Sequence, residues 1–360
     1  MALTRIGILT GGGDCPGLNA VIRAVVKAAA MRGWETLGIR EGFEGLLDPV
    51  QTMALDYSQM GSLLTQGGTI LGTSNRGRFA AKTGLGETRR IPREILDKAK
   101  ATVESLGLKA LVCVGGDGTL TIAQQLYETG VPVIGVPKTI DNDLEATLAT
   151  FGFDSAVSCA TDALDRLHST AESHNRVMVL EVMGRYAGWI AISAGISGGG
   201  DVILIPEIPF RYESVCAKIA EREKRGKRFT LVMAAEGASE AGGSVAARDA
   251  GSDREARLGG IGQRVASEIE ARTGKETRVV VLGHLQRGGG PTSFDRLLCT
   301  RFGARAVELA AEGRYGQMVA LRPPDTVAVP IAEAVGRLRR VPVDGDLVRT
   351  ARALGISLGD

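Results

Sequence analysis

The chain has 360 residues, 44% of them hydrophobic, and a formal net charge of +2 from 43 basic and 41 acidic residues. This length allows one large core or two, and the balanced charge gives no electrostatic reason to expect a nucleic acid or an anionic membrane as partner. No apolar run is long enough to span a bilayer, and the 5 scattered cysteines lack metal-site spacing, so we expect free thiols in a reducing cytoplasm.

The first predicted elements are typical of a nucleotide-binding protein. An apolar strand at residues 5–10 leads into the glycine loop GGGDCPG at 11–17, and a helix with regular apolar spacing follows at 18–32. A glycine loop between strand and helix places phosphate near a helix N-terminus. Pro16 stands where the dinucleotide-binding fingerprint needs its last glycine, and the sequence lacks the P-loop motif, so neither of those two classes is indicated.

A second glycine loop surrounds a single acid. Residues 111–119, reading LVCVGGDGT, form an apolar strand followed by glycines on both sides of Asp117. Glycine allows a backbone to approach a phosphate closely and to point N–H groups at it. Because Mg²⁺ takes one or two carboxylates together with phosphate oxygens, the stretch predicts a site for nucleotide phosphates and metal.

The next strand, at residues 131–136, feeds the loop TIDND at 139–143, which presents Asp141 and Asp143. In an open α/β sheet, ligands bind outside the carboxyl ends of the strands. A carboxylate there can accept a proton from a substrate hydroxyl. We therefore interpret this loop as the site of a hydroxylated substrate.

Strand and helix patterns alternate through the rest of the chain. Strands are also predicted at residues 36–39, 176–182, 202–206, 230–235 and 278–282, and helices at 93–106, 120–129, 154–173, 186–196, 211–225, 259–273, 294–312 and 347–354. Each polar cluster lies just after a strand. The alternation predicts an α/β fold of two doubly wound lobes with mostly parallel sheets.

Six motifs stand together in one order: GGGDCPGLN, GGDGT, PKTIDND, SHNRV, EVMGRYAG and GHLQRGG. With them the sequence resembles the 6-phosphofructokinases over nearly its whole length. GGDGT also occurs in NAD kinases and lipid kinases, so the ordered set carries the specificity. The resemblance implies Mg²⁺-dependent transfer of a phosphoryl group from ATP to the 1-hydroxyl of fructose 6-phosphate in glycolysis. It also implies a nucleotide-binding lobe (residues 1–152 and 286–336) and a sugar-phosphate-binding lobe (153–285 and 337–360), with the site between them.

The resemblance implies a role for each site residue. Asp141 matches the general base, Arg185 the residue that stabilises the transferring phosphate, and Thr139 and Asp143 those that hold the reacting groups. The implied ATP site comprises Gly12, Gly13, Arg76, Gly116, Asp117, Gly118 and Thr119, with Asp117 as the Mg²⁺ ligand. The implied sugar-phosphate site comprises Thr139, Ile140, Asp141, Arg176, Met183, Gly184, Arg185, Glu236, Arg278, His284, Leu285, Gln286 and Arg287.

Two of these residues imply a neighbouring subunit. Arg176 and Arg278 match arginines that reach into the site of an adjacent subunit, so we expect a homotetramer or homodimer with shared sites. Taken singly, each site residue also has an ordinary structural interpretation: His284 as a loop histidine, or Asp141 and Asp143 as caps of a turn. The joint match and the position of all of them at strand ends favour the functional interpretation.

By the same resemblance, Gly118 and Lys138 control the phosphoryl donor. Diphosphate-dependent relatives carry Asp and Lys at these positions, and ATP-dependent bacterial forms carry Gly at both. A carboxylate at position 118 would repel an α-phosphate, by about 4 kcal/mol for unit charges about 4 Å apart at the effective dielectric of a protein surface. Glycine imposes no such barrier, so we expect ATP. A diphosphate-dependent enzyme is the alternative, and a non-catalytic sensor subunit with the same fold is a remote one.

Overall fold

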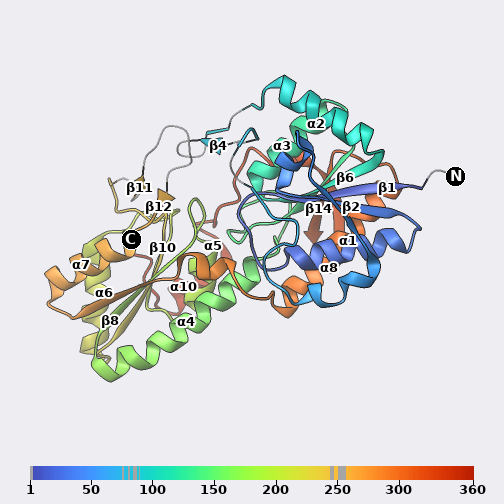
Figure 1. Cartoon of the computed structure of the whole chain (residues 1–360). Helices are drawn as coiled ribbons and strands as arrows, with labels where there is room; N and C mark the ends of the chain where they lie inside the picture. The colour runs from blue at the N-terminus through green and yellow to red at the C-terminus, as the bar shows by residue number, and fades with distance from the viewer. Residues whose placement is uncertain are drawn as a thin grey trace. The chain divides into compact units, whose positions relative to one another are not determined.

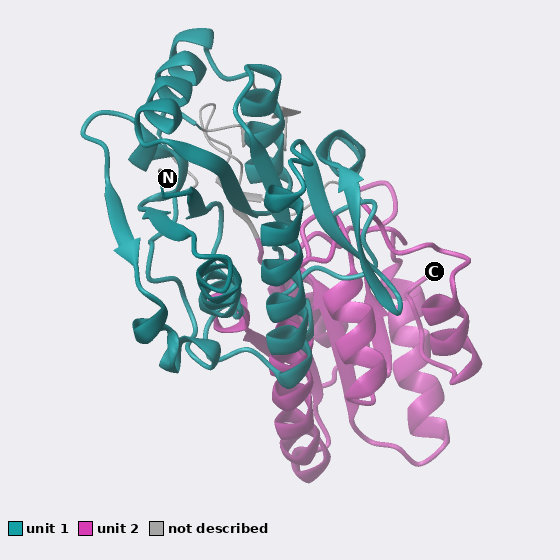
Figure 2. Cartoon of the chain, turned by 90° about the vertical axis from the view of Figure 1, so that its right-hand side faces the viewer, with its two compact units in different colours: residues 1–140, 144–154, 287–338 teal, residues 141–143, 155–286, 339–360 magenta. Residues whose placement is uncertain are grey.

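The computed structural model describes residues 3–74, 77–79, 82–83, 87–88, 90–243, 247–249 and 257–360. The chain forms two compact units, shown in teal and magenta in Figure 2. Unit 1 comprises Met1–Ile140, Leu144–Asp154 and Arg287–Leu338, and unit 2 comprises Asp141–Asp143, Ser155–Gln286 and Arg339–Asp360. One passage from unit 1 to unit 2 falls within the TIDND loop, between Ile140 and Asp141.

Over the described residues, unit 1 is built on a seven-stranded sheet in the order β15-β14-β7-β6-β1-β2-β3. Its strands are β1 (Arg5–Thr10), β2 (Glu35–Ile39), β3 (Thr52–Leu55), β6 (Leu108–Gly115), β7 (Val133–Pro137), β14 (Gln317–Arg322) and β15 (Asp325–Pro330). Neighbouring strands pair in parallel except at the edges, where β3 lies antiparallel to β2 and β15 antiparallel to β14. The central strands are buried, which explains why β6 and β7 are nearly continuous apolar runs in the sequence.

Helices cover the sheet of unit 1. They are α1 (Leu18–Ala30), α2 (Arg93–Ser105), α3 (Asp117–Glu128), α8 (Ser293–Ala311) and the short α9 (Ile331–Ala334). Helices α1 and α8 pack side by side (Figure 1), and a Cβ added to Gly303 of α8 would lie 2.6 Å from the Cβ of Ala24. Short 3-10 helices at η1 (Gly42–Leu46), η2 (Tyr57–Met60) and η3 (Ser62–Leu64) and a small hairpin of β4 (Lys82–Thr83) and β5 (Glu87–Thr88) complete the unit.

The described part of unit 2 has a four-stranded parallel sheet in the order β13-β8-β10-β9. The strands are β8 (Val177–Val182), β9 (Val202–Leu204), β10 (Thr230–Ala235) and β13 (Thr277–Val281). The helices of this part of the chain are α4 (Phe153–His174), α5 (Trp189–Ser197), α6 (Tyr212–Lys224), α7 (Ile261–Thr273) and α10 (Asp346–Ala353), with the 3-10 helix η4 (Gly283–Arg287) and a pair of short strands, β11 (Ala247–Asp249) and β12 (Arg257–Leu258).

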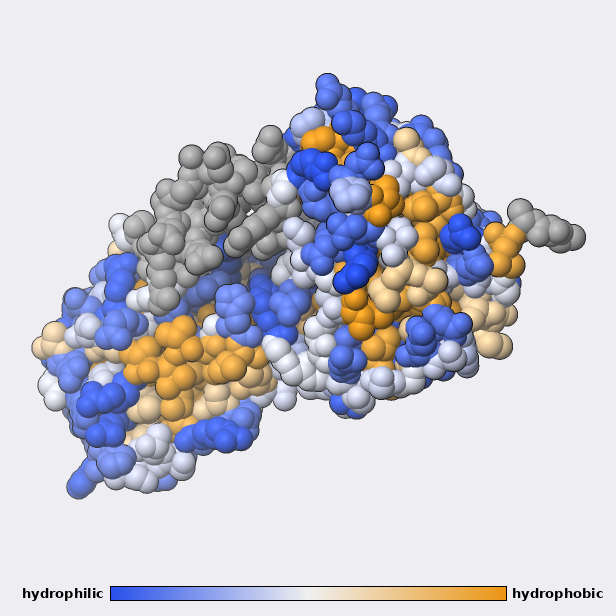
Figure 3. All heavy atoms as spheres, in the orientation of Figure 1, coloured by the Kyte–Doolittle hydropathy of each residue, from blue (hydrophilic) through white to orange (hydrophobic). Residues whose placement is uncertain are grey.

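The two edges of this sheet differ. At the β9 edge, the C-terminal segment lies alongside: Ser357 accepts a hydrogen bond from the Ile203 N–H at 2.9 Å, and its own N–H donates to the Asp201 carbonyl at 3.0 Å. At the β13 edge, Val281 is 45% exposed, and Leu285, in η4, is 69% exposed. Figure 3 shows a group of apolar side chains over the β13 side of the sheet. An apolar sheet edge of this kind is typical of a surface that binds another protein.

The predicted α/β architecture with mostly parallel sheets is confirmed. The predicted helix at residues 186–196 begins later, at Trp189, because Gly188 adopts a non-helical conformation as its N-cap. No element was predicted at residues 317–330, where β14 and β15 form a hairpin. All 5 cysteines lie in described residues and are free thiols, and burial raises the pKa of Cys15 to about 12. Among the described residues there is no helix with the length and apolar character needed to cross a membrane.

Candidate active site

Three loops of unit 1 meet at the carboxyl ends of adjacent strands. The order β7-β6-β1 brings together the loops that follow these strands, which is the edge where open α/β sheets bind ligands. Backbone hydrogen bonds fix the loops to one another: the Gly11 N–H donates to the Val114 carbonyl at 2.9 Å, and the Lys138 N–H donates to the Gly115 carbonyl at 2.9 Å. The predicted phosphate loop and the start of the TIDND loop therefore share one edge of the sheet.

The glycine loop after β1 packs tightly against residues 73–74 and Thr119. Gly12 has a φ of 75°, in the left-handed region that favours glycine. Its N–H donates to the Ser74 carbonyl at 3.2 Å, and its carbonyl accepts from the Thr73 hydroxyl at 2.6 Å. A Cβ added to Gly11 would lie 2.7 Å from the Thr119 hydroxyl oxygen, so only glycine allows this approach. Arg76, which the resemblance places here, lies outside the described residues.

Helix α3 begins at the motif GGDGT. Gly116 is its N-cap, and Asp117, Gly118 and Thr119 form its first turn, whose N–H groups lack partners within the helix and attract anions. A Cβ added to Gly118 would meet no atom within 4 Å, whereas one on Gly116 would lie 3.2 Å from the Lys138 carbonyl oxygen. Position 118 therefore opens into free space beside the amides.

Two cationic side chains donate hydrogen bonds to carbonyl groups of the glycine loop. Lys138 is 3% exposed, and its ammonium group donates to the Gly13 carbonyl. The Arg287 guanidinium donates to the Asp14 carbonyl at 3.0 Å and lies 2.7 Å from the position of a Cβ on Gly13. The resemblance implies a 6-phosphate contact for Arg287, whereas in this structure its guanidinium group contacts the glycine loop of unit 1.

The donor set fits a magnesium ion that is bound together with phosphates. Asp117 places a carboxylate, one oxygen of which is buried, at the N-terminus of α3. Within the described ranges, no group of three or more His, Cys, Asp or Glu side chains is arranged to hold a metal by itself. Mg²⁺ usually takes one or two carboxylates, with the remaining ligands from phosphate oxygens and water, and Asp117 can supply one such carboxylate.

In unit 2, the loops after β8 and β10 lie side by side at the carboxyl edge of the sheet. The Glu236 N–H donates to the Val182 carbonyl at 2.8 Å, and the Gly237 N–H donates to the Gly184 carbonyl at 3.1 Å. Gly184 has a φ of 139°, a conformation that L side chains rarely adopt. These bonds place Arg185, the next residue, beside the loop that carries Glu236.

The loop after β13 joins this edge. The side-chain oxygen of Gln286 accepts a hydrogen bond from the Met183 N–H at 3.4 Å, and its amide group donates to the Gly283 carbonyl at 3.1 Å. Gln286 is 1% exposed and so supports the MGR loop, whereas His284 and Leu285 are exposed. The structure thus brings together, in unit 2, the predicted residues Met183, Gly184, Arg185, Glu236, His284, Leu285 and Gln286.

Arg176 and Arg278 lie at the opposite end of the same sheet. Arg176 precedes β8, and Arg278 is the second residue of β13, which runs parallel to β8. Both guanidinium groups form ion pairs with Glu276, at 2.8 Å for Arg176. Arg176 precedes the six-residue strand β8 and so lies about 20 Å from the loop that follows it, whereas Arg278 lies three residues, about 10 Å, before the end of β13.

The TIDND loop divides between the units. Thr139 and Ile140 belong to unit 1, where Ile140 is buried and the Thr139 carbonyl accepts from the Thr150 hydroxyl at 2.7 Å. Asp141 and Asp143 belong to unit 2, where one Asp141 carboxylate oxygen is buried and the Asp143 carbonyl accepts from the Arg339 N–H at 2.8 Å.

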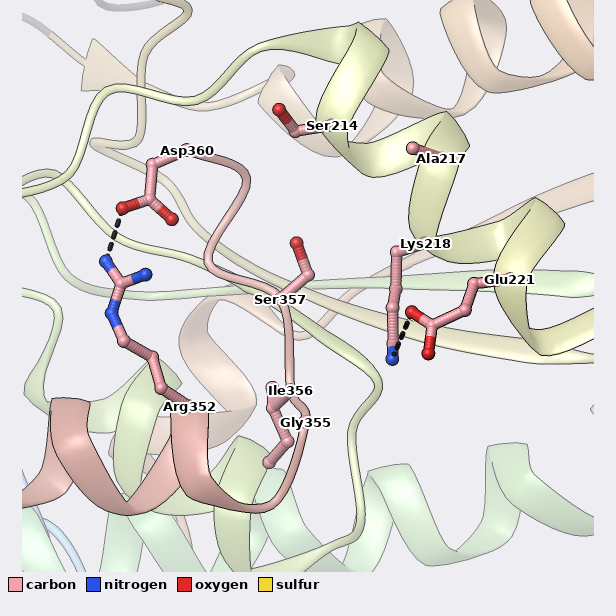
Figure 4. Close-up of a pocket in the computed structure, with 9 residues that line it drawn as sticks. All are labelled: Ser214, Ala217, Lys218, Glu221, Arg352, Gly355, Ile356, Ser357 and Asp360. Carbon is pink, nitrogen blue, oxygen red and sulfur yellow. Dashed lines mark hydrogen bonds and ion pairs between the residues drawn. The ribbon is translucent and has the colours of Figure 1, made fainter.

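A surface hollow of about 490 Å³ in unit 2 lies away from these residues (Figure 4). It is lined by parts of α6 and the C-terminal segment, and its charges pair among themselves: Lys218 with Glu221 at 3.0 Å, and Arg352 with Asp360. None of the predicted site residues lines it, so we do not assign the reaction to this hollow.

Comparison with known proteins agrees with the motifs. The family model described as Phosphofructokinase matches residues 5–310. The chain is 56% identical to the ATP-dependent 6-phosphofructokinase of Chloroflexus aurantiacus, over 99% of this chain and 98% of that protein. It is 52% identical to the ATP-dependent 6-phosphofructokinase 1 of a Synechocystis species, over 99% of both.

Solved structures show the same fold. The structure of phosphofructokinase from Saccharomyces cerevisiae has a TM-score of 0.78 and 29% identity, over 92% of this chain and 45% of that chain. The pyrophosphate-dependent phosphofructokinase from Nitrosospira multiformis has a TM-score of 0.81, over 99% of this chain and 93% of that chain, but only 21% identity, which supports the fold alone. The matched family model and the near full-length relatives together show that the chain belongs to the phosphofructokinase family.

Proposed function

We propose that the chain transfers the γ-phosphoryl group of ATP to the 1-hydroxyl of fructose 6-phosphate, which gives fructose 1,6-bisphosphate and ADP in glycolysis. The observation that carries this proposal is the 56% identity, over 99% of the chain, to a relative named ATP-dependent 6-phosphofructokinase. The loops that follow the strands support the proposal. They supply backbone N–H groups that can bind phosphate, a carboxylate that can bind a metal ion, and a carboxylate that can accept a proton.

ATP is the donor that the loop geometry favours over diphosphate. Gly118 leaves space beside the N-terminal amides of α3, where a nucleotide needs room for its α-phosphate. Lys138 already donates to the Gly13 carbonyl, so its charge acts on the loop that faces the phosphates and does not close this space. The pyrophosphate-dependent protein from Nitrosospira multiformis is far more distant, at 21% identity, than the ATP-dependent relatives.

The chain's own residues divide the chemistry between the two units. We assign the phosphates of ATP to unit 1, through the glycine loop at Gly12 and Gly13 and the N–H groups of the first turn of α3. We assign fructose 6-phosphate to Glu236, the MGR loop and His284 of unit 2. Because ATP and sugar phosphate are both anionic, backbone N–H groups and arginines are suitable ligands for them.

The acceptor hydroxyl must lose a proton as the phosphoryl group arrives. We propose that the Asp141 carboxylate accepts this proton, while Asp143 and Thr139 hold the reacting groups in place. Arg185 supplies a fixed positive charge for the oxygens of the transferring group, which is the main way in which proteins stabilise phosphoryl transfer. Asp117 would hold Mg²⁺ against the donor phosphates, and the ion would neutralise part of their charge.

The position of Arg176 and Arg278 supports sites shared between subunits. Both lie toward the amino ends of their strands, Arg176 about 20 Å from the loop that follows β8 and Arg278 about 10 Å before the end of β13. We propose that from there they serve the site of a neighbouring subunit. The apolar β13 side of the sheet, with Val281 45% exposed, is suitable for contact between subunits. We therefore propose a homodimer or homotetramer. Because the proposed reaction belongs to glycolysis, we also propose a location in the cytoplasm.

A direct assay tests the function. Purified protein with fructose 6-phosphate, ATP and Mg²⁺ should release ADP and fructose 1,6-bisphosphate in equal amounts, as measured by coupled enzymes and by phosphorus NMR of the product. Release of ADP without phosphorylation at the 1-position would contradict the acceptor assignment. No consumption of either substrate would contradict the proposed function as a whole.

A further inference from the structure

The segment at residues 339–341 contacts the loop that carries the predicted base. The Arg339 N–H donates to the Asp143 carbonyl at 2.8 Å, and the Arg339 guanidinium donates to the Asn142 carbonyl at 3.3 Å. Both accepting carbonyls belong to the residues that directly follow Asp141, and all of these residues belong to unit 2. Asn142 is 4% exposed and has a φ of 51°, so the loop is held in a conformation that is uncommon for residues other than glycine.

Arg339 also contacts the start of α5. The indole N–H of Trp189 donates to the Arg339 carbonyl at 2.9 Å, and the Arg339 guanidinium carbon lies 4.4 Å from the centre of the Trp189 ring. A guanidinium over the face of an indole is attracted by the charge distribution of the ring, and the attraction is stronger when the pair is shielded from water. Trp189 is 8% exposed, so Arg339 is fixed both through its backbone and through its side chain.

Glu207 connects the same segment with the loop that carries Arg185. Its carboxylate accepts hydrogen bonds from the Val341 N–H at 2.8 Å and from the Gly188 N–H at 3.0 Å and 3.1 Å to its two oxygens. Gly188 ends the loop at residues 183–188 and is the N-cap of α5, where a negative charge is favourable. A Cβ on Gly188 would lie 2.4 Å from the Cβ of Ile205 and 3.0 Å from the Glu207 carboxylate, so the close packing at this position needs glycine.

We propose that Arg339, Trp189 and Glu207 form a brace that fixes the position of the Asp141 loop backbone relative to the Arg185 loop backbone. The inference rests on the proposed function, because these side chains are proposed to position the groups that react. They are not proposed to contact the substrate. Arg339 and Val341 lie outside the residues that the family model matches. In a site that must align a base and a cation on one phosphoryl transfer, a displacement of about 1 Å costs about 10²-fold in rate.

The experiment compares variants of the full-length chain. Arg339→Ala should lower kcat by about 30- to 100-fold while the KM for ATP changes less than about three-fold, because the brace acts on alignment and not on donor binding. Arg339→Lys keeps a cation over the ring and should recover part of that loss. Arg349→Ala is the matched control: it removes an exposed arginine of the same C-terminal segment that pairs with Asp346 and should leave kcat unchanged.

Amide hydrogen exchange provides a readout that does not depend on activity. In Arg339→Ala, exchange should become faster at residues 141–146 and 183–190 and should stay unchanged in α6 and α7. If the alanine variant does not fold, Trp189→Phe and Glu207→Ala decide: the first removes the indole N–H that donates to the Arg339 carbonyl, and the second removes the acceptor of the Val341 and Gly188 N–H groups. A folded Arg339→Ala protein with kcat within three-fold of the wild type overturns the proposal, and so does a general increase in exchange with no local excess. If the wild type is inactive, the proposed function fails, and the exchange data alone then decide whether the brace exists.

Discussion

The ammonium group of Lys138 donates a hydrogen bond to the carbonyl oxygen of Gly13, so the lysine at the end of β7 holds the glycine loop that follows β1. Lys138 is 3% exposed, and this contact together with the phosphates expected nearby compensates its burial. The residue that the family resemblance connects with diphosphate use is thus also a structural partner of the donor loop. Its presence is compatible with ATP as donor.

The open space at Gly118 leads to a prediction on donor choice. Gly118→Asp should lower kcat/KM for ATP by at least about 100-fold, because a carboxylate about 4 Å from a phosphate costs about 4 kcal/mol at a surface-like dielectric. Gly118→Asn, which has the same size and no charge, is the control and should lose much less. Lys138→Gly alone should leave ATP as the preferred donor. Steady-state kinetics with both donors check this, and equal losses in the Asp and Asn variants would contradict a charge effect.

Asp141→Asn should nearly abolish turnover and leave substrate binding almost intact. Asparagine keeps the shape of the side chain but cannot accept a proton, and the loss of a positioned base typically costs about 10²–10⁴-fold in rate. The measurement is kcat together with the dissociation constant for fructose 6-phosphate from calorimetry. Turnover within a few-fold of the wild type would exclude Asp141 as the base.

The placement of Arg278 at the far end of its sheet predicts complementation between subunits. Arg278→Ala and Asp141→Asn should each be inactive as pure proteins. After mixed refolding or subunit exchange, some sites would combine an intact Arg278 from one chain with an intact Asp141 from another, and activity should return in part. Proven exchange, shown by mass spectrometry of hybrids, without any return of activity would contradict shared sites.

Glu207 predicts a pH-dependent stability difference. Burial raises the pKa of Glu207 above its ordinary value of 4.5, although hydrogen bonds from the N–H groups of Val341 and Gly188 act in the opposite direction. Between 4.5 and this raised pKa, the folded chain binds more protons than the unfolded chain, so the contribution of Glu207 to the free energy of unfolding decreases as pH rises.

In the Glu207→Gln variant, the side chain at position 207 does not titrate between pH 4.5 and the raised pKa of Glu207. The Tm of the wild type should therefore fall relative to that of Glu207→Gln as pH rises from about 4.5, and the difference should become constant once the pH exceeds the raised pKa. Calorimetry of both proteins across this pH range measures the difference. A Tm difference that is independent of pH, or that changes in the opposite direction, would contradict the raised pKa.

Particular residues show why the sequence predicted part of the molecule and not the rest. The loops GGDGT and TIDND were found because each follows an apolar run, and in the structure they do lie after β6 and β7 at one edge of a sheet. The close backbone contacts of these loops could also be predicted, because glycine in such a loop allows another group to approach the backbone closely.

Contacts between distant residues were not predictable. Arg339 stands in the unremarkable run GRLRR, and only the fold brings it to Asp143 and Trp189, 196 and 150 residues away in the sequence. Likewise, Glu207 follows an ordinary strand, and its role depends on Gly188 and Val341. The contact of Arg287 with the glycine loop was missed for the same reason, because its motif points to a sugar phosphate while its guanidinium reaches Asp14.

The comparison of donors tests the central claim most directly. The measurement is kcat/KM of the wild-type protein for ATP and for diphosphate, each with saturating fructose 6-phosphate and Mg²⁺, with fructose 1,6-bisphosphate followed as the product. We predict a higher kcat/KM for ATP than for diphosphate. A higher value for diphosphate would contradict the assignment of this chain as an ATP-dependent enzyme.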